Sequence, residues 1–414
     1  MSRKNIIFSL AVILMVVLVG WVINISSFPL PKNAVLLDEK GNSMWYNRPA
    51  ISADKNNLYA GWMTSNRKVV VAKIDRKTLH IKNIKHIHTW HYLSDHGSPV
   101  VHIIQNGPYK GRLVAIYSLH NSEIYFQRTK EPGNIDKWES KKVINKCECT
   151  YPTLLENKGV LYLFYRKMTD PELNTRSYFL MKSKDFGNTW DKEQEIISAN
   201  DGEWIYAMVN KDDHDNIHIV WGVTDPKYND LKNIYYAISS DKGISWKSKT
   251  GAKAYSKILS TSEFLIYQSP KGMFTRVWDF TIKKDYFPAL LYVNYENSQV
   301  HAYWLSEEKD KWLKLNLGLS SYNYYPCGLV FNNANAKSVY IAKPQENNVS
   351  TIYELEIDPQ KKSVETHWHI NNQSKYDYCR PISNTFSKDL IFTAVKSYKN
   401  FMKFDTAIIG VPVH

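Results

Sequence analysis

Cysteine is scarce in this chain of 414 residues, which contains four: Cys147, Cys149, Cys327 and Cys379. None of them has the spacing of a zinc finger. A single residue separates Cys147 from Cys149, so an ordinary disulfide between these two is not expected. Cys327 follows Tyr-Pro and Cys379 precedes Arg-Pro, so these two either bridge neighbouring repeats or remain buried thiols. The sequence leaves the disulfide state of all four open.

The chain also lacks any recognisable nucleic-acid module and any arm rich in arginine and lysine. Its net charge of +13 favours an acidic partner, such as an anionic polysaccharide, an anionic lipid or a nucleic acid. Without a module, nucleic acid ranks last of the three. His86, His88 and His91 resemble a metal cluster, but their spacing suits no standard metal site. We therefore predict no cofactor and no metal site, and leave a structural ion open.

Charge is absent from the apolar run at residues 6–25, which follows Arg3 and Lys4. About 20 apolar residues suffice to cross a bilayer, whereas a cleavable signal peptide has a shorter apolar region and a small-x-small cleavage site. We therefore expect an uncleaved signal anchor, with Arg3 and Lys4 in the cytoplasm and the bulk of the chain on the extracytoplasmic side. A cleaved export signal is the alternative.

Two short segments share the pattern Ser-x-Asp-x-Gly-x-Thr/Ser-Trp. They begin at Ser183 and Ser239, 56 residues apart, and each follows an aromatic, strand-like run. In a tight turn, Asp accepts backbone N–H groups and Gly adopts positive φ, while Trp packs back between sheets. The pattern resembles the Asp box of sialidase-like β-propellers, which implies a structural role. The residues concerned are Ser183, Asp185, Gly187, Trp190, Asp241, Gly243 and Trp246.

The rest of the chain divides into units of about 40–60 residues, the period of propeller blades. Each unit opens with a short apolar strand, followed by a turn, a second strand and an aromatic third strand. The units begin near residues 45, 98, 151, 203, 278, 325 and 380. Residues 34–38 can add a strand to the last unit and close the ring, which leaves no open sheet edges. Residues 250–276 fit no unit and are expected to form a long connection.

The predicted fold class is therefore all-β: a seven-bladed β-propeller with Asp-box blades, preceded by one N-terminal transmembrane helix. The expected organisation is a cytoplasmic tail at 1–5, the membrane anchor at 6–25, a linker at 26–33 and the propeller at 34–414.

A further order of motifs runs through the first half of the propeller. It consists of Asp-His-x-x-Pro at 95–99, Tyr-Ser-x-His-Asn at 117–121, Tyr-Pro at 151–152 and Tyr-Leu-Phe-Tyr-Arg at 162–166, followed by an Asp box. This order resembles the BNR-repeat family, which contains the seven-bladed ulvan lyases. The resemblance spans most of the chain from about residue 45 and is densest over 95–246. The chain departs from the family after His96, where Gly-Ser stands, and in the fourth unit, which lacks Arg-Pro at its start.

The resemblance implies a set of site residues. The implied catalytic residues are His96, His120, Tyr151 and Arg166, and the implied substrate-binding residues are Tyr206, Tyr165 and Asn121. A structural role is the alternative for each: a hydrogen-bonded histidine at a strand end, a tyrosine that packs before proline, or an arginine paired with Asp170.

Three functions remain open. The first is a lyase that cleaves an acidic, uronate-containing polysaccharide by β-elimination, with Arg166 on the carboxylate, a histidine as base, and Tyr151 or the second histidine as acid. The second is a glycoside hydrolase of the rhamnosidase or sialidase kind, although the arginine triad of a sialidase cannot be assembled here. The third is a non-catalytic propeller that binds glycan or scaffolds the cell envelope.

Overall fold

The computed structural model describes residues 34–44, 46–225, 227, 230–251, 253–284, 287–296, 299–308, 311–320, 328–332, 336–344, 350–370, 378–382 and 390–411. The expected membrane anchor, the linker and Cys327 lie outside these residues. Within them, no helix is long and apolar enough to span a membrane.

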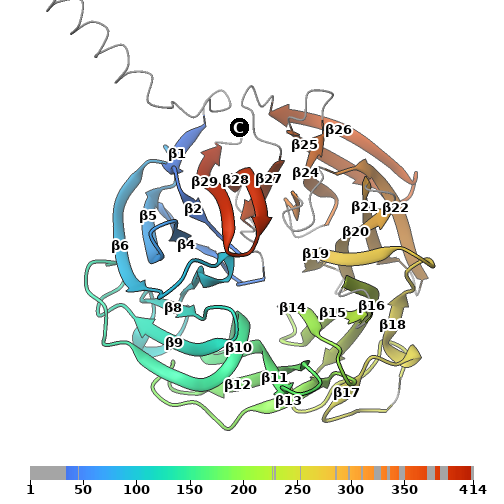
Figure 1. Cartoon of the computed structure of the whole chain (residues 1–414), viewed down its shortest axis with the longest axis horizontal. Helices are drawn as coiled ribbons and strands as arrows, with labels where there is room; N and C mark the ends of the chain where they lie inside the picture. The colour runs from blue at the N-terminus through green and yellow to red at the C-terminus, as the bar shows by residue number, and fades with distance from the viewer. Residues whose placement is uncertain are drawn as a thin grey trace, which may run out of the picture.

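The described strands form six sheets that follow one another around a ring (Figure 1). The first sheet contains β2 (Gly41–Asn42), β3 (Ile51–Ala53), β4 (Asn57–Thr64), β5 (Lys68–Asp75) and β6 (Ile81–Thr89). The second has eight strands: β7 (Val100–Ile103), β8 (Leu113–Tyr117), β9 (Ser122–Arg128), β10 (Lys142–Asn157), β11 (Val160–Asp170), β12 (Thr175–Ser183), β13 (Gln194–Ser198) and β17 (Ile258–Leu259). Pairing is antiparallel except between β13 and β17.

Each of the other four sheets has four strands. The third contains β14 (Ile205–Lys211), β15 (Ile217–Asp225), β16 (Asp230–Ser239) and β18 (Leu265–Tyr267). The fourth contains β19 (Phe274–Ile282), β20 (Pro288–Glu296), β21 (Gln299–Glu308) and β22 (Lys311–Leu319). The fifth contains β23 (Leu329–Phe331), β24 (Ser338–Pro344), β25 (Ser350–Asp358) and β26 (Ser363–Ile370). The sixth contains β27 (Tyr378–Ile382), β28 (Leu390–Asn400), β29 (Lys403–Val411) and β1 (Val35–Asp38). Cys379 lies in β27.

The first described strand closes the ring. β1 pairs with β29, with Val35 opposite Gly410 and Leu36 opposite Ile409, so the strand nearest the N-terminus completes the sheet nearest the C-terminus. This closure was expected from the sequence, and it removes the edge that an open ring would expose.

The sequence predicts that residues 250–276 form a long connection outside the blades, and the structure differs from this prediction. These residues contain β17 and β18, joined by the 3₁₀ helix η3 (Ser262–Phe264), and β18 supplies the fourth strand of its sheet by pairing with β16. β18 is only three residues long and follows an excursion after the Asp box. A strand of that length is too short to show a clear periodicity.

The core lies between neighbouring sheets. All but the last residue of β4 are buried, whereas no residue of β6 is, which separates an inner strand packed on both faces from a solvated outer strand. The indoles of Trp62, Trp221 and Trp304 are fully buried, and each N–H donates to an acceptor on a neighbouring strand or turn. Bound in this way, a large aromatic ring fills the space between sheets without leaving a donor unpaired.

Both Asp boxes form the predicted turn. Asp185 accepts hydrogen bonds from the backbone N–H of Thr189 and from the hydroxyls of Ser183 and Thr189, at 2.6–2.8 Å. Asp241 makes the same set with Ser239 and Ser245. The two central glycines have φ of 93° and 77°, as predicted. A Cβ on Gly187 would come within 2.2 Å of the Phe126 ring, so the position also requires a residue without a side chain.

Candidate active site

The loop that carries His96 is fixed by its surroundings. His96 lies in the 3₁₀ helix η1 (Asp95–Gly97), just before β7, and is only 3% exposed. The hydroxyl of Ser94 accepts a hydrogen bond from the backbone N–H of His96 at 3.3 Å. The buried amide of Asn47 donates to the carbonyl oxygen of His96 at 2.9 Å. These bonds hold the backbone of His96 in one position before any ligand arrives.

Both ring nitrogens of His96 have side-chain partners. Nδ1 lies 2.6 Å from Oδ1 of Asp95 and 3.2 Å from the hydroxyl of Ser94, and Nε2 lies 2.9 Å from the hydroxyl of Tyr151. Because Nδ1 faces a carboxylate, it carries the proton of the neutral ring, and Nε2 accepts a hydrogen bond from Tyr151. The phenolic proton of Tyr151 therefore has a base beside it.

A turn from the far end of the chain supports this pair. The hydroxyl of Tyr398, in β28, donates to Oδ2 of Asp95 at 2.6 Å, across 303 positions of sequence. Phe401, in the β28–β29 turn, places its ring 5.5 Å from the ring of His96 and 5.0 Å from that of His120. Asp95 is fully buried, so this hydrogen bond offsets the cost of burying its carboxylate.

His120 lies in the turn between β8 and β9, next to His96. The two imidazole rings are 4.7 Å apart, edge to face. Burial lowers the pKa of His120 to about 2, with further lowering from the nearby His96, Arg166 and Arg176. His120 is therefore neutral at any pH near neutrality. The adjacent Asn121 has a positive φ of 51°, and its backbone N–H donates to the hydroxyl of Thr150 at 3.1 Å.

Tyr151 owes its position to a bulge in β10. The first half of this strand pairs with β9 and the second half with β11, and the register shifts between Thr150 and Thr153. Tyr151 sits in the shift with φ of 61°, a conformation that costs a residue with a Cβ about 1–3 kcal/mol. Bulges re-aim side chains next to active sites. Here the bulge turns the phenol toward His96.

Aromatic rings surround Arg166, which is 1% exposed in β11. Its guanidinium carbon lies 4.6 Å from the ring centre of Tyr151 and 4.4 Å from that of Tyr206, the second residue of β14. Tyr46 packs against both tyrosine rings, at 5.0 and 5.5 Å. Cation–π contacts of this kind hold a guanidinium in place and keep it charged.

His96, His120, Tyr151, Arg166 and Tyr206 are thus brought together, as the family resemblance implies, and Asn121 borders them. Three of these residues lie in or next to β7, β10 and β14: η1 with His96 precedes β7, Tyr151 lies in the bulge of β10, and Tyr206 is the second residue of β14. Asp170, the alternative partner for Arg166, accepts a hydrogen bond from the backbone N–H of Leu173 in the β11–β12 turn.

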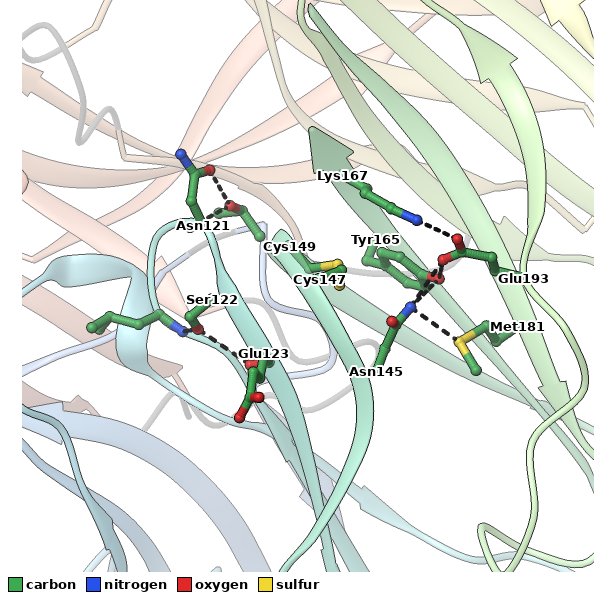
Figure 2. The surroundings of a disulfide bond; sticks show 12 residues. Asn121, Ser122, Glu123, Asn145, Cys147, Cys149, Tyr165, Lys167, Met181 and Glu193 are labelled. Carbon is green, nitrogen blue, oxygen red and sulfur yellow. Dashed lines mark hydrogen bonds and ion pairs between the residues drawn. A yellow bond between two sulfur atoms is a disulfide. The ribbon is translucent and has the colours of Figure 1, made fainter. Parts of the chain in front are cut away.

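Tyr165 is not part of this group. It precedes Arg166 in β11, and neighbouring side chains of a strand point to opposite faces. Its hydroxyl donates to Glu193 at 2.7 Å and accepts from Asn145 at 2.8 Å (Figure 2). Lys167 pairs with the same glutamate. The hydroxyl of Tyr165 thus serves a polar cluster on the other face of the sheet rather than the histidine pair.

Cys147 and Cys149 form a disulfide, beside this cluster (Figure 2). The expectation that these two would not pair is therefore wrong. The two residues lie on the same side of β10, and their Cα atoms are 5.3 Å apart, within the usual range for a disulfide. β10 is irregular here, because its register with β9 shifts between Asn145 and Cys149. The spacing alone does not reveal such a shift.

Sequence reasoning missed several residues that contact this candidate group. They are Tyr46, Asp95, Arg176, Trp204, Tyr398 and Phe401. Asp95 stands next to His96 in the Asp-His-x-x-Pro motif, so its contact with His96 could have been predicted from the sequence. Arg176 was a second signal, since it is a charged residue at the start of the apolar run before the first Asp box.

The histidines at 86, 88 and 91 lie in β6 and the loop after it. The imidazole of His88 packs edge to face against Trp90 at 4.4 Å. Among the residues that the structure describes, no three His, Cys, Asp or Glu side chains are grouped so that they could hold a metal ion. His88, His91, Asn121 and Tyr125 instead help to line an open hollow of about 410 Å³.

The chain belongs to the BNR repeat-containing family, whose sequence model matches residues 57–318. No curated protein sequence matches it.

Its fold is that of the ulvan lyase-like β-propellers. It is similar to a PL25 ulvan lyase, a polysaccharide lyase solved bound to -[GlcA(1-4)Rha3S]-, with 12% identity, coverage of 92% of this chain and 96% of that one, and a TM-score of 0.74. It is also similar to the polysaccharide lyase Uly1, with 11% identity, coverage of 92% and 98%, and a TM-score of 0.62. At these identities, the likeness is one of fold.

Proposed function

We propose that this protein cleaves an acidic, uronate-containing polysaccharide by β-elimination. The observation that carries this proposal is the hydrogen bond between Tyr151 and His96 next to the buried guanidinium of Arg166. Elimination beside a carboxylate needs a cation to neutralise that carboxylate and a base to remove the proton on C5. Arg166 supplies the cation, and Tyr151 with His96 supplies the base, among the same cluster of aromatic rings.

Arg166 is the cation in this proposal. A planar guanidinium binds a carboxylate through two parallel hydrogen bonds and stays charged at any working pH. Once the carboxylate charge is offset, the C5 proton becomes acidic enough to be removed. The rings of Tyr151 and Tyr206 hold the guanidinium in place.

Tyr151 and His96 together move the proton. The oxygen of Tyr151 takes the C5 proton while its own phenolic proton passes to Nε2 of His96. The C4–C5 double bond forms, the C4–O4 bond breaks, and the departing O4 oxygen takes a proton from Tyr151, which recovers its own from His96. The net result is one proton moved from C5 to O4. The carboxylate of Asp95 stabilises the imidazolium in between.

His120 plays a different part from His96. With a pKa lowered to about 2, its ring stays neutral near neutral pH and is a weak base in the free protein. A neutral imidazole still donates one hydrogen bond and accepts another. We assign it to the orientation of the sugar, together with Tyr206 and Asn121.

The function is tested by incubating the full-length protein with a panel of anionic polysaccharides. Two products are measured, the ultraviolet absorbance of an unsaturated uronate and the number of new reducing ends. A rise in both identifies elimination. New reducing ends without absorbance identify a glycoside hydrolase and contradict the proposal, as does binding without any product.

Two proposals extend to the whole chain. The eight-stranded sheet can be counted as two blades that share β10, since its first half pairs with β9 and its second with β11. Counted in this way, the sheets make seven blades. The apolar run at residues 6–25 supports a membrane anchor, with the propeller on the extracytoplasmic side, where polysaccharides are found.

A further inference from the structure

Arg176 is buried beside the candidate site with donors that nothing nearby uses. It is the second residue of β12 and is 6% exposed. Its Nε and Nη1 atoms are buried, and no hydrogen-bond acceptor reaches them within the part of the chain that the structure describes. A buried donor without an acceptor costs about 1–3 kcal/mol, and more when the group is charged. A ligand that supplies a hydrogen-bond acceptor would remove this cost.

The side chain of Arg176 points toward the site rather than away from it. In the β11–β12 pairing, Arg166 stands opposite Tyr178, and Arg176 is two residues from Tyr178, so both arginines leave the same face of the sheet. The guanidinium carbon of Arg176 lies 4.0 Å from the ring centre of Trp204, and that of Arg166 lies 5.6 Å from the same ring. The two cations therefore share one indole.

Hydrogen bonds hold the indole of Trp204 and the backbone of Arg176 in place. The ring N–H of Trp204 donates to the carbonyl oxygen of Asn174 at 2.6 Å. The backbone N–H of Arg176 donates to the carbonyl oxygen of Glu203 at 2.9 Å. Trp204 and Arg176 are thus each hydrogen-bonded to a neighbouring turn. The guanidinium of Arg176 is therefore held against the indole before a ligand arrives.

Among the described residues, no carboxylate reaches Nε or Nη1 of Arg176. The carboxylate of Glu203 accepts two hydrogen bonds from Asn200, and Glu148 is exposed. Burial, and then the charge of Arg166, lower the pKa of Arg176 to about 10, so it remains charged at neutral pH. Two buried cations next to each other repel, and an anion bound between them or beside them relieves that repulsion.

We propose that Arg176 binds a second oxyanion of the substrate, a sulfate ester or a carboxylate on the sugar next to the uronate that Arg166 holds. This inference rests on the proposed function. Sulfate and carboxylate present the same pair of oxygens to a planar guanidinium. Arg176 thereby selects polymers that carry acidic groups on successive sugars.

The first test is kinetic and uses the substrate found in the polysaccharide panel. Arg176→Gln removes the charge and keeps a polar side chain of similar length. We expect KM to rise about 10- to 100-fold, the equivalent of one lost hydrogen bond to a charged group, while kcat stays within about twofold. Arg176→Lys should recover only part of the loss, because it keeps the charge but not the planar fork. Lys77→Gln, at an exposed turn, is the charge-matched control and should leave KM unchanged.

A desulfated form of the same polymer identifies the second oxyanion. If the effect of Arg176→Gln on KM disappears on the desulfated polymer, the group is a sulfate ester, and if the effect persists, it is a carboxylate. An unchanged KM for Arg176→Gln on both polymers overturns the inference. A purely structural role predicts that outcome together with a lower melting temperature.

The second test does not depend on catalysis. Calorimetric titration of the full-length protein with inorganic sulfate should give a binding signal that Arg176→Gln weakens at least tenfold and Lys77→Gln does not. If this result holds while no polysaccharide is cleaved, the proposed lyase function fails and the oxyanion site stands. If polysaccharide is cleaved but sulfate binds equally well to Arg176→Gln and to the native protein, the oxyanion site fails and the lyase stands.

Discussion

The hydroxyl of Tyr151 meets His96 because one residue of β10 adopts a positive φ. The motif order identified both residues and implied that they share a site. The bulge that brings them into contact could not be predicted, because positive φ at a residue other than glycine depends on the surrounding fold. The same holds for Asp95, whose partner Tyr398 is 303 positions away in the sequence.

The hydroxyl of Tyr151 can be removed without disturbing the ring. Tyr151→Phe should lower kcat about 10²–10⁴-fold, the usual contribution of a general acid–base group. The ring contacts with His96 and Tyr46 remain, so the melting temperature should change little. Tyr165→Phe is the matched control: it removes a hydroxyl from the opposite face of the sheet and should leave kcat unchanged. Equal turnover in both variants would rule out Tyr151 as the proton carrier.

The lowered pKa of His120 predicts how stability responds to pH. Its pKa in the folded protein is about 2, against about 6.5 in the unfolded chain. The unfolded chain therefore binds the extra proton first, and stability that is complete above about pH 6.5 is lost as the pH falls below it. The slope contributed by this one group is at most about 1.4 kcal/mol per pH unit. Urea unfolding between neutral pH and about pH 4 should show a flatter decline for His120→Asn. If the unfolding free energy falls with pH equally steeply in the native protein and in His120→Asn, the lowered pKa of His120 does not contribute to this pH dependence.

At the level of turns and strands, the local sequence was enough to predict the two Asp-box turns but not every strand. The Asp boxes were predicted as tight turns built around a carboxylate, because the hydrogen bonds that form them join residues no more than four positions apart. The strand β18 and the disulfide in β10 were not predicted, because a three-residue strand has no readable period and a register shift depends on the partner strand. The hydrogen bonds of a local turn could be predicted, whereas the register between neighbouring strands could not.

Each Asp box should act as an independent stabilising turn. Asp185→Ala and Asp241→Ala each leave turn donors without their acceptor, and each should lower the free energy of unfolding by about 1–3 kcal/mol. Substrate KM should stay the same, since neither carboxylate contacts the histidine pair. The exposed Asp191, just after the first box, provides the control, and its alanine variant should change stability by less than about 0.5 kcal/mol. A loss of turnover at an unchanged melting temperature would instead place these turns in the site.

Across the whole molecule, one ion pair joins distant parts of the ring. Arg48 lies 2.5 Å from Asp279 of β19, with side chains 16% and 4% exposed, and its carbonyl oxygen accepts the backbone N–H of Leu154 in β10. Asp279→Ala leaves a largely buried guanidinium without this carboxylate and should cost about 3–5 kcal/mol of unfolding free energy. Glu131→Ala, which breaks a surface pair with Lys137, should cost no more than about 1 kcal/mol. If chemical denaturation gives the same loss of unfolding free energy for Asp279→Ala and Glu131→Ala, the ion pair between Arg48 and Asp279 stabilises the protein no more than a surface pair does.

The membrane anchor concerns the whole molecule as well, and it rests on sequence alone. An apolar run of about 20 residues partitions into a bilayer, and Arg3 and Lys4 before it favour retention of the N-terminus in the cytoplasm. The full-length protein should therefore sediment with membranes and resist a carbonate wash. Protease added outside intact cells or spheroplasts should digest the propeller. Replacement of Val16 and Leu18 by arginine, in the middle of the run, should abolish membrane retention, because each charge at the centre of a span costs about 2.5–3.5 kcal/mol. Release of the native protein by carbonate at its full length would show that no anchor holds it, and a shortened native protein outside the cell would identify a cleaved export signal.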